Sequence, residues 1–259
     1  MSRTLVLVGC LIFSLSGFAA EDRGHEIFAQ RDLRDSGWTD SSVAYHMELR
    51  TGDGRSVSRQ VRVMSLEGGS DAGDQILLIF DAPADVAGTA LLTHDDLEPD
   101  QAMQWLYLPA YKRVRRIASA NRSGRFMGTE FTYEDLLGDP LEDFSYRYQG
   151  EADYRGRKVF RIERTPLGRY SAYGRQETLV DEDTLQVVQA VLYDRDGQAV
   201  KRYEADDWRL YRDRYWRSHK MVMTDLVSGR STILTASDYE LNSGLRESDF
   251  RPAALSRTQ

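Results

Sequence analysis

Tight turns at short intervals constrain this 259-residue chain more than any other feature. From Trp38 onward, runs of alternating apolar and polar residues are separated by glycine-containing turns, as where residues 43–49 are followed by the turn 51–54 (TGDG). Asp-Gly supplies the positive φ that hairpin turns need, and a period of two is typical of strands with one buried face. Further hairpin turns are expected at residues 154–156, 194–197 and 227–229. The sequence therefore predicts hairpin-connected antiparallel strands.

About ten or eleven such strands predict a mainly β domain with a few short helices, built as one large curved antiparallel sheet or barrel. Residues 75–80 (QILLIF) and 185–193 (LQVVQAVLY) do not alternate, so we expect both of their sides to be covered. Residues 22–34 are the best helix candidate, with Gly37 just past the end. The interior of such a half-barrel is a ligand pocket in outline.

The N-terminal residues are typical of a secretory signal peptide. Arg3 supplies the positive charge, residues 5–15 are mostly apolar, and small residues precede a cleavage site after Ala19 or Ala20. The apolar run is too short to span a bilayer, and no later segment is apolar enough to do so. We therefore expect export across a membrane.

This interpretation divides the chain into a signal peptide at residues 1–19 and a single domain at residues 20–259. A lipidated Cys10 is the alternative, because the residues before it resemble a lipobox. Cys10 is the only cysteine, so a cleaved chain would contain no disulfide.

The most distinctive stretch, residues 104–137, combines aromatic and basic residues. Trp105 and Tyr107 lie on an expected strand, and no acidic residue occurs from Gln101 to Thr129. Six basic residues form an island there: Lys112, Arg113, Arg115, Arg116, Arg122 and Arg125. Because the whole chain has a net charge of −7, this island points to binding, whereas the overall charge argues against a nucleic-acid partner.

Two interpretations of the island remain open. Its arginines are either paired with acidic residues on a solvated strand, or they form a positive rim for a lipid headgroup or an acidic patch of a partner. Alternation places Arg113 and Arg115 on one face and Arg116 on the other. We expect Arg113 or Arg115 at the mouth of the cavity.

The next segment, residues 126–133 (FMGTEFTY), is rich in aromatic side chains. Phe126, Met127, Phe131 and Tyr133 either plug the core or form a mobile gate over an apolar cavity. Together with Trp105 and Tyr107 they are the predicted ligand-binding residues.

Catalytic signals are weak. The histidines are scattered, and none has the spacing of a zinc-binding helix; they are His25, His46, His94 and His219. The chain also lacks a nucleophile elbow, a phosphate-binding glycine loop and a dinucleotide fingerprint. The sequence predicts a protein that is not an enzyme and that needs no metal or cofactor.

Three segments together resemble the outer-membrane lipoprotein-sorting protein family, which is akin to the periplasmic carrier LolA. They are residues 105–109 (WLYLP), 113–117 (RVRRI) and 126–136 (FMGTEFTYEDL), and residues 247–252 (ESDFRP) add a C-terminal match. The resemblance covers the whole mature chain. It implies an incomplete barrel of about eleven antiparallel strands closed by helices, a hydrophobic cavity for acyl chains, and a periplasmic location.

The resemblance also implies cooperation with an inner-membrane exporter of the resistance-nodulation-division type. The leading hypothesis is a carrier that moves lipid acyl chains or lipoproteins towards the outer membrane, with Arg113, Arg115 and Arg116 as a rim for headgroup or partner. An adaptor subunit of a transporter, with a fully packed interior, is the alternative. A secreted hydrolase with scattered carboxylates is the third hypothesis.

Overall fold

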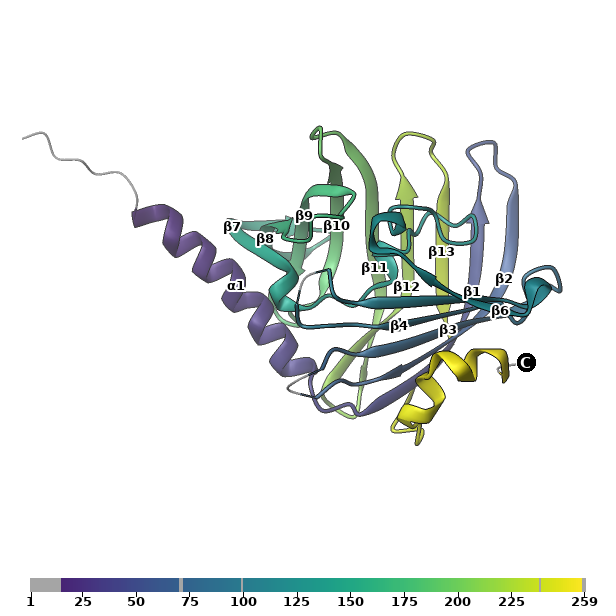
Figure 1. The fold of residues 1–259 in the computed structure, drawn as a ribbon. Coiled ribbons are helices and arrows are strands. Elements are labelled where there is room, and N and C mark those ends of the chain that lie inside the picture. The colour runs from purple at the N-terminus through teal and green to yellow at the C-terminus, as the bar shows by residue number, and fades with distance from the viewer. Residues whose placement is uncertain (1–14, 70–71, 99, 238, 258–259) are drawn as a thin grey trace, which may run out of the picture.

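The computed structural model describes residues 15–69, 72–98, 100–237 and 239–257 (Figure 1). Within these residues, fourteen strands form a single antiparallel sheet. The strands are β1 (Asp40–Arg50), β2 (Ser56–Leu66), β3 (Gln75–Ala82), β4 (Ala90–His94), β5 (Met103–Leu108), β6 (Arg113–Ile117), β7 (Phe144–Tyr154), β8 (Arg157–Pro166), β9 (Tyr173–Asp181), β10 (Val187–Asp194), β11 (Ala199–Tyr211), β12 (Tyr215–Asp225), β13 (Ser231–Ala236) and β14 (Glu240–Leu241).

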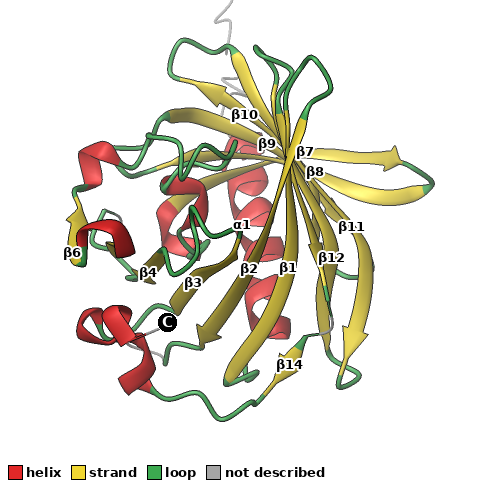
Figure 2. Ribbon diagram, turned by 90° about the vertical axis from the view of Figure 1, so that its right-hand side faces the viewer, coloured by secondary structure: helices red, strands yellow, loops and turns green. Residues whose placement is uncertain are grey.

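The order across the sheet is β6-β5-β4-β3-β2-β1-β13-β12-β11-β10-β9-β8-β7, and β14 pairs with β1. The edge strands β6 and β7 do not pair, so the curved sheet stays open (Figure 2). The expected incomplete antiparallel barrel is confirmed, although it has more strands than the expected eleven or so. β4 was not expected, because four of its five residues are buried and its sequence does not alternate.

The four predicted hairpins connect β1 to β2, β7 to β8, β10 to β11 and β12 to β13. In the first turn, Thr51 N–H donates to the carbonyl of Arg55 at 2.9 Å. Gly54 has a φ of +85°, a conformation that glycine adopts without strain. The pairing that follows places Val43 opposite Val63, so the apolar sides of both strands meet on one face of the sheet.

Helix α1 (Leu15–Asp35) contains the predicted helix 22–34 and begins earlier. Most of the predicted signal peptide, residues 1–14, lies outside the described residues. Phe28 packs on Tyr146 of β7 with ring centroids 4.8 Å apart. A Cβ on Gly24 would lie 3.0 Å from the Cβ of Tyr146, so glycine permits the helix to lie close along this edge strand.

Short 3₁₀ helices complete the fold: η1 (Pro109–Tyr111), η2 (Ser119–Asn121), η3 (Glu134–Leu136), η4 (Leu141–Asp143), η5 (Glu247–Phe250) and η6 (Pro252–Arg257). Phe250 and Leu255 of the last two are buried against Leu77 and Ile79 on one side of β3. Leu78 and Phe80 are buried on the other side, so both faces of β3 are covered, as expected. In β10 the same expectation is confirmed only in part, because buried residues alternate with partly exposed ones along the strand and none is fully exposed.

Candidate functional site: a cavity on the concave face

The concave face of the sheet encloses a cavity of about 840 Å³. Side chains from six strands form its apolar wall: Val63, Leu78, Leu91, Ala190, Leu192, Met221, Met223 and Leu234. The other side is formed by the C-terminal part of α1 and by the segment 131–143, which crosses the concave face. This volume lies within the range of about 300–1,000 Å³ that is usual for small-molecule sites. The hollow of the sheet is therefore only partly filled by the protein.

The segment 126–133 fills the part of the hollow beside the cavity. Phe126 is 1% exposed, and its ring centroid lies 5.6 Å from that of Phe80 and 5.4 Å from that of Tyr133. Phe131 is also buried, and it lies at the boundary where it lines the cavity. The structure thus favours a core plug over a mobile gate for Phe126.

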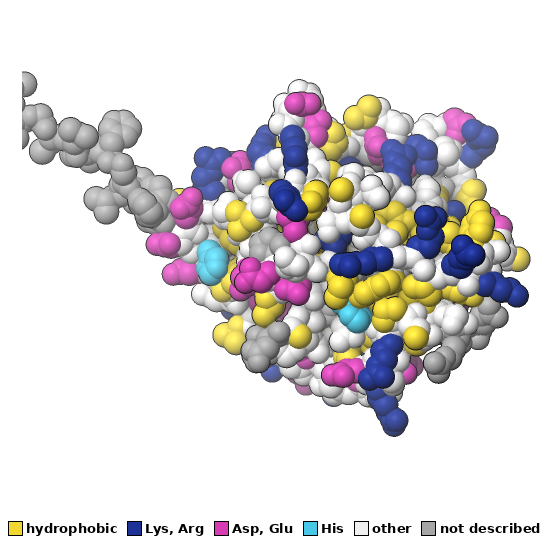
Figure 3. Space-filling model, in the orientation of Figure 1, with side chains coloured by type: hydrophobic (Ala, Val, Ile, Leu, Met, Phe, Trp, Pro, Cys, Tyr) yellow, Lys and Arg dark blue, Asp and Glu magenta, His cyan; other side chains and the backbone are white. Residues whose placement is uncertain are grey.

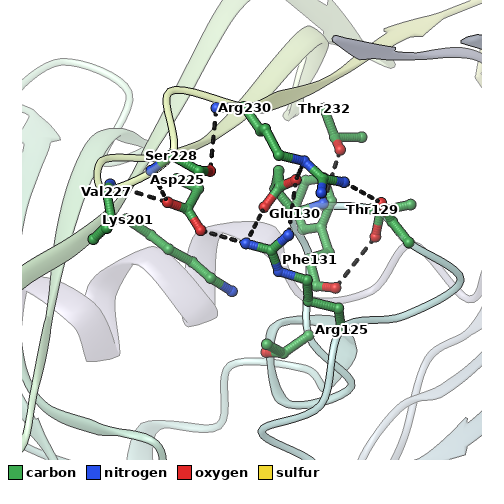
Figure 4. Close-up of polar contacts among 12 residues, drawn as sticks. Arg125, Thr129, Glu130, Phe131, Lys201, Asp225, Val227, Ser228, Arg230 and Thr232 are labelled. Carbon is green, nitrogen blue, oxygen red and sulfur yellow. Dashed lines mark hydrogen bonds and ion pairs between the residues drawn. The ribbon is translucent and has the colours of Figure 1, made fainter. Parts of the chain in front are cut away.

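Glu130 fastens this plug to the sheet (Figure 4). Its carboxylate is almost fully buried and forms ion pairs with Arg125 at 3.0 Å and with Arg230 at 2.8 Å. Its backbone N–H donates to the hydroxyl of Thr232 on β13 at 2.9 Å. Arg125 also pairs with Asp225 of β12. Two arginines therefore compensate one buried carboxylate, which is the condition under which a buried charge is tolerated.

Asp139 fastens the later part of the segment. Arg31 of α1 donates to its carboxylate at 2.7 Å, and Arg164 of β8 donates at 2.7 and 2.8 Å. The Arg164 guanidinium also lies between the rings of Phe28 and Phe144, at 4.9 and 4.2 Å from their centroids. Burial would raise the pKa of Asp139, but the charges of Arg164 and Arg31 outweigh it and hold the pKa well below its usual value.

Acidic side chains outnumber basic ones in the lining of the cavity. Ten Asp and Glu residues line the cavity, against three arginines. Burial raises the pKa of Asp95 to about 7, helped by the charges of Asp74 and Asp143 and opposed by a 2.7 Å hydrogen bond from Gly138 N–H. Burial and the neighbouring Asp139 raise the pKa of Asp143 to about 6. Figure 3 shows acidic side chains gathered on the α1 side of this face, with basic ones towards the β6 side.

Comparison with solved structures places this geometry in a family. A crystal structure described as a candidate outer membrane lipoprotein-sorting protein domain from Vibrio parahaemolyticus has 40% sequence identity to the chain and a TM-score of 0.89. The alignment covers 92% of this chain and 100% of that one. The chain belongs to this lipoprotein-sorting family. A family model described as "Uncharacterized protein" also matches residues 72–257, which is more than half of the chain.

Two further structures share the lipoprotein-sorting fold. A DUF1329 family protein from Desulfovibrio piger is 29% identical, with a TM-score of 0.85 and coverage of 91% of this chain and 99% of that one. The LolA superfamily protein NE2245 from Nitrosomonas europaea is 17% identical, with a TM-score of 0.70 and coverage of 88% and 97%, and supports the fold alone.

Among curated sequences, PA3922 from Pseudomonas aeruginosa is 24% identical over 218 residues, which cover 67% of this chain and 48% of that protein. The chain therefore spans about half the length of this relative.

The predicted ligand-binding residues of this lipoprotein-sorting domain lie in three places. Phe131 lines the cavity. Phe126, Met127 and Tyr133 pack in the core cluster beside it. Trp105 and Tyr107 do not line the cavity, because they face the opposite side of β5, towards Phe250 and Leu255. Any contact of these six residues with a ligand stays a prediction.

Arg113, Arg115 and Arg116 are exposed on the edge strand β6. Arg113 and Arg115 lie opposite Leu108 and Leu106, and Arg116 lies opposite Trp105, so the arginines project from both faces of the sheet. The expectation that Arg113 or Arg115 lines the cavity mouth is wrong, since neither is among its lining residues. Their role as a rim for a headgroup or partner stays a prediction.

Arg122 is the basic-island residue that does reach the cavity. It is 5% exposed and donates to the carbonyl of Ala102, and within the described residues it has no ion pair. Burial lowers its pKa, while the nearby charges of Asp100 and Asp95 act against this. Sequence reasoning also missed Arg31, Arg164 and Asp139, which come together from three distant segments with no local motif.

Proposed function

We propose that this lipoprotein-sorting domain is a periplasmic carrier that shields lipid or lipoprotein acyl chains from water and moves them towards the outer membrane. The observation that carries the proposal is the cavity of about 840 Å³ beneath an apolar strand wall. Each CH₂ group hidden from water contributes about 0.8 kcal/mol. An acyl chain of ordinary length would therefore stay bound while the protein diffuses.

The charges around the cavity narrow the class of ligand. With ten acidic side chains against three arginines around the cavity, an anionic headgroup would meet like charge in a partly desolvated site. An acyl ester or amide without charge at its polar end has no such cost. We therefore propose an uncharged acylated group as the ligand, with lipoprotein acyl chains as one example.

Delivery would involve other components. The family resemblance favours an inner-membrane exporter of the resistance-nodulation-division type as the partner, and the expected signal peptide, residues 1–19, favours the periplasm as the location. Among the described residues, no helix has the length and apolar character needed to cross a bilayer. The alternative remains an adaptor subunit of a transporter that binds no lipid.

A pair of cavity variants tests the proposal. Met221 and Leu234 face each other across β12 and β13 and line the cavity. Replacing both by Trp (Met221→Trp with Leu234→Trp) should narrow the cavity. The control pair, Val222→Trp with Ile233→Trp, places the same volume at the neighbouring positions of the same strands, on the opposite face.

Two measurements are made on each protein: mass spectrometry of co-purifying lipid, and uptake of a fluorescent acyl ester without charge. We expect the natural protein and the control to bind and the cavity variant to lose at least tenfold in affinity, equivalent to about 1.4 kcal/mol. A fluorescent fatty acid, ionised at neutral pH, should bind more weakly than the ester. If the natural protein neither carries lipid nor takes up either probe, the carrier proposal fails and the adaptor is favoured.

A further inference from the structure

The two edges of the sheet are protected in different ways. Helix α1 packs along β7, and its Phe28 contacts Tyr146 there. At the other edge, β6 pairs only with β5, and although the C-terminal helix η6 lies nearby, four of the five β6 residues are exposed. Open edges invite pairing with other chains, and proteins commonly protect them with charged residues. Edge protection alone does not require charges of only one sign.

The charge at this edge is strongly positive. Lys112, Arg113, Arg115 and Arg116 occupy four of five consecutive positions, and all four are exposed. Within the described residues, none of them forms an ion pair. The chain without them would carry −11 (−7 minus 4), so cations are concentrated here against the overall balance.

The short spacing of residues along a strand brings these four cations close together. At about 3.3 Å per residue the five positions span roughly 15 Å, so neighbouring charges lie within the Debye length of about 8 Å at physiological salt. The side chains point to both faces of the sheet, because Arg113 and Arg115 lie opposite Leu108 and Leu106 while Arg116 lies opposite Trp105. We call these four residues the β6 basic edge.

An exposed aromatic residue lies beside the basic edge. Tyr111, in the turn that connects β5 to β6, is 71% exposed, and Val114 within β6 is 37% exposed. A tyrosine next to several cations is typical of proteins that bind at the surface of a bilayer, where the ring reaches the headgroup level and the cations meet anionic lipids.

We infer that the β6 basic edge is a docking surface for the anionic headgroups of a membrane. Cations that point in divergent directions need partners on both faces and at the tip. Lipids move laterally and can meet each cation, whereas a folded acidic protein would have to enclose the edge. The basic edge and the acidic cavity lining would then have separate roles: anionic lipids would attract the domain, and the cavity would admit only an uncharged acyl group. This inference deepens the proposed carrier function, and the role of docking in lipid transport rests on that function.

Vesicle co-sedimentation tests the inference directly. Vesicles of phosphatidylcholine, with and without phosphatidylglycerol, are mixed with the natural protein at low and high salt. We expect binding only to the vesicles with phosphatidylglycerol, and weaker binding at high salt because the surface charges are screened. The triple variant Arg113→Gln, Arg115→Gln, Arg116→Gln should bind about a hundredfold more weakly, as expected from the loss of three cations near an anionic surface.

A matched control removes three cations elsewhere. Lys158, Arg161 and Arg202 are also exposed, on β8 and β11, and have no ion pair within the described residues. Their triple Gln variant has the same net charge and should bind the vesicles within about twofold of the natural protein, if location and not total charge decides. Circular dichroism confirms that both variants are folded.

Two outcomes would overturn the inference. One is equal binding of the natural protein to both kinds of vesicle, and the other is equal loss of binding in both triple variants. Uptake of the uncharged acyl probe without vesicles separates the two proposals. The β6 variant should take up the probe normally, so its loss of vesicle binding tests docking alone, whereas vesicle binding without any probe uptake would leave docking in place and remove the carrier function.

Discussion

The concave face has a closed part around Phe126 and Glu130 and an open part around the cavity. In the closed part, aromatic rings are in contact and the buried carboxylate of Glu130 has two arginine partners. In the open part, Leu234 and Met221 line the cavity, and the pKa of Asp95 is raised because burial outweighs the hydrogen bond from Gly138 and the charge of Arg122. The closed part has the features of a stable core, whereas the open part contains a cavity and has fewer packing contacts and fewer paired charges. Functional sites commonly show such local losses of stability.

The largest expected effect comes from truncation in the closed part. Phe126→Ala removes a ring that contacts Phe80 and Tyr133 and leaves a cavity that the anchored segment cannot collapse to fill. We expect the free energy of unfolding to fall by about 4 kcal/mol. Chemical denaturation followed by circular dichroism measures this change. A loss below about 1 kcal/mol would mean that this part is as loosely packed as the cavity wall.

The charge network of the closed part should be next in importance. Glu130→Gln keeps the shape of the side chain but leaves Arg125 and Arg230 without their shared charge. We expect a loss of about 2 kcal/mol in unfolding free energy, which is less than for a fully buried pair because both arginines are more than one third exposed and Arg125 keeps its pair with Asp225. Asp207→Asn is the control, since its pair with Arg209 is exposed and should contribute less than about 1 kcal/mol. Equal effects of the two variants would argue against a special role for Glu130.

In the open part, removing a buried charge should raise stability instead of lowering it, and the effect should depend on pH. The pKa of Asp95 is about 7 in the folded protein, against 3.8 as its ordinary value, so between these values the folded state binds more protons than the unfolded state. Stability from this group is therefore complete below about pH 4 and declines as pH rises towards 7. Asp95→Asn removes the charge and should raise the unfolding free energy by about 2 kcal/mol at pH 8.

At pH 4 the same substitution should change stability little, since Asp95 is then protonated. Thermal unfolding of both proteins at pH 4, 6 and 8 measures the difference. Asp74, Asp143 and Arg122 all act on this carboxyl group, so part of the pH dependence will remain in the variant. An Asn variant that is less stable at pH 8 would contradict the assignment.

The smallest effect is expected in the cavity wall. Leu234→Ala enlarges a space that is already open, so fewer contacts are lost than in the closed part, and we expect a change of about 1 kcal/mol. Uptake of the uncharged acyl probe should persist. Differential scanning calorimetry of Leu234→Ala beside Phe126→Ala gives the comparison directly, and similar losses would remove the distinction between the two parts.

The strands and hairpins were predictable from the sequence. The side of the sheet, concave or convex, to which a given side chain points was not. Alternation and Asp-Gly turns located the hairpins, and the continuous apolar run 75–80 correctly indicated a strand covered on both faces. Alternation also shows that Trp105 and Tyr107 share one side of a strand. It does not show which side is concave, and these two residues face the C-terminal helices instead of the cavity.

The polar part of the site could not be predicted for a different reason. Asp139 meets Arg31 and Arg164 only because α1, the crossing segment and β8 converge, and these positions are 108 and 25 residues apart in sequence. No local spacing marks such a group. Arg122 belongs to a run of cations that looks uniform in sequence, yet the structure buries it while Arg113, Arg115 and Arg116 stay exposed.

The order of polar and apolar residues was enough to determine strands, turns and a curved sheet, because a period of two and the special backbone of glycine act over a few neighbouring residues. Only the tertiary structure decided how much of the hollow was filled, which carboxylates gained a cation, and which arginines remained at an uncovered edge. Those outcomes depend on contacts between segments far apart in the chain, and burial and charge pairing arise only when such segments meet.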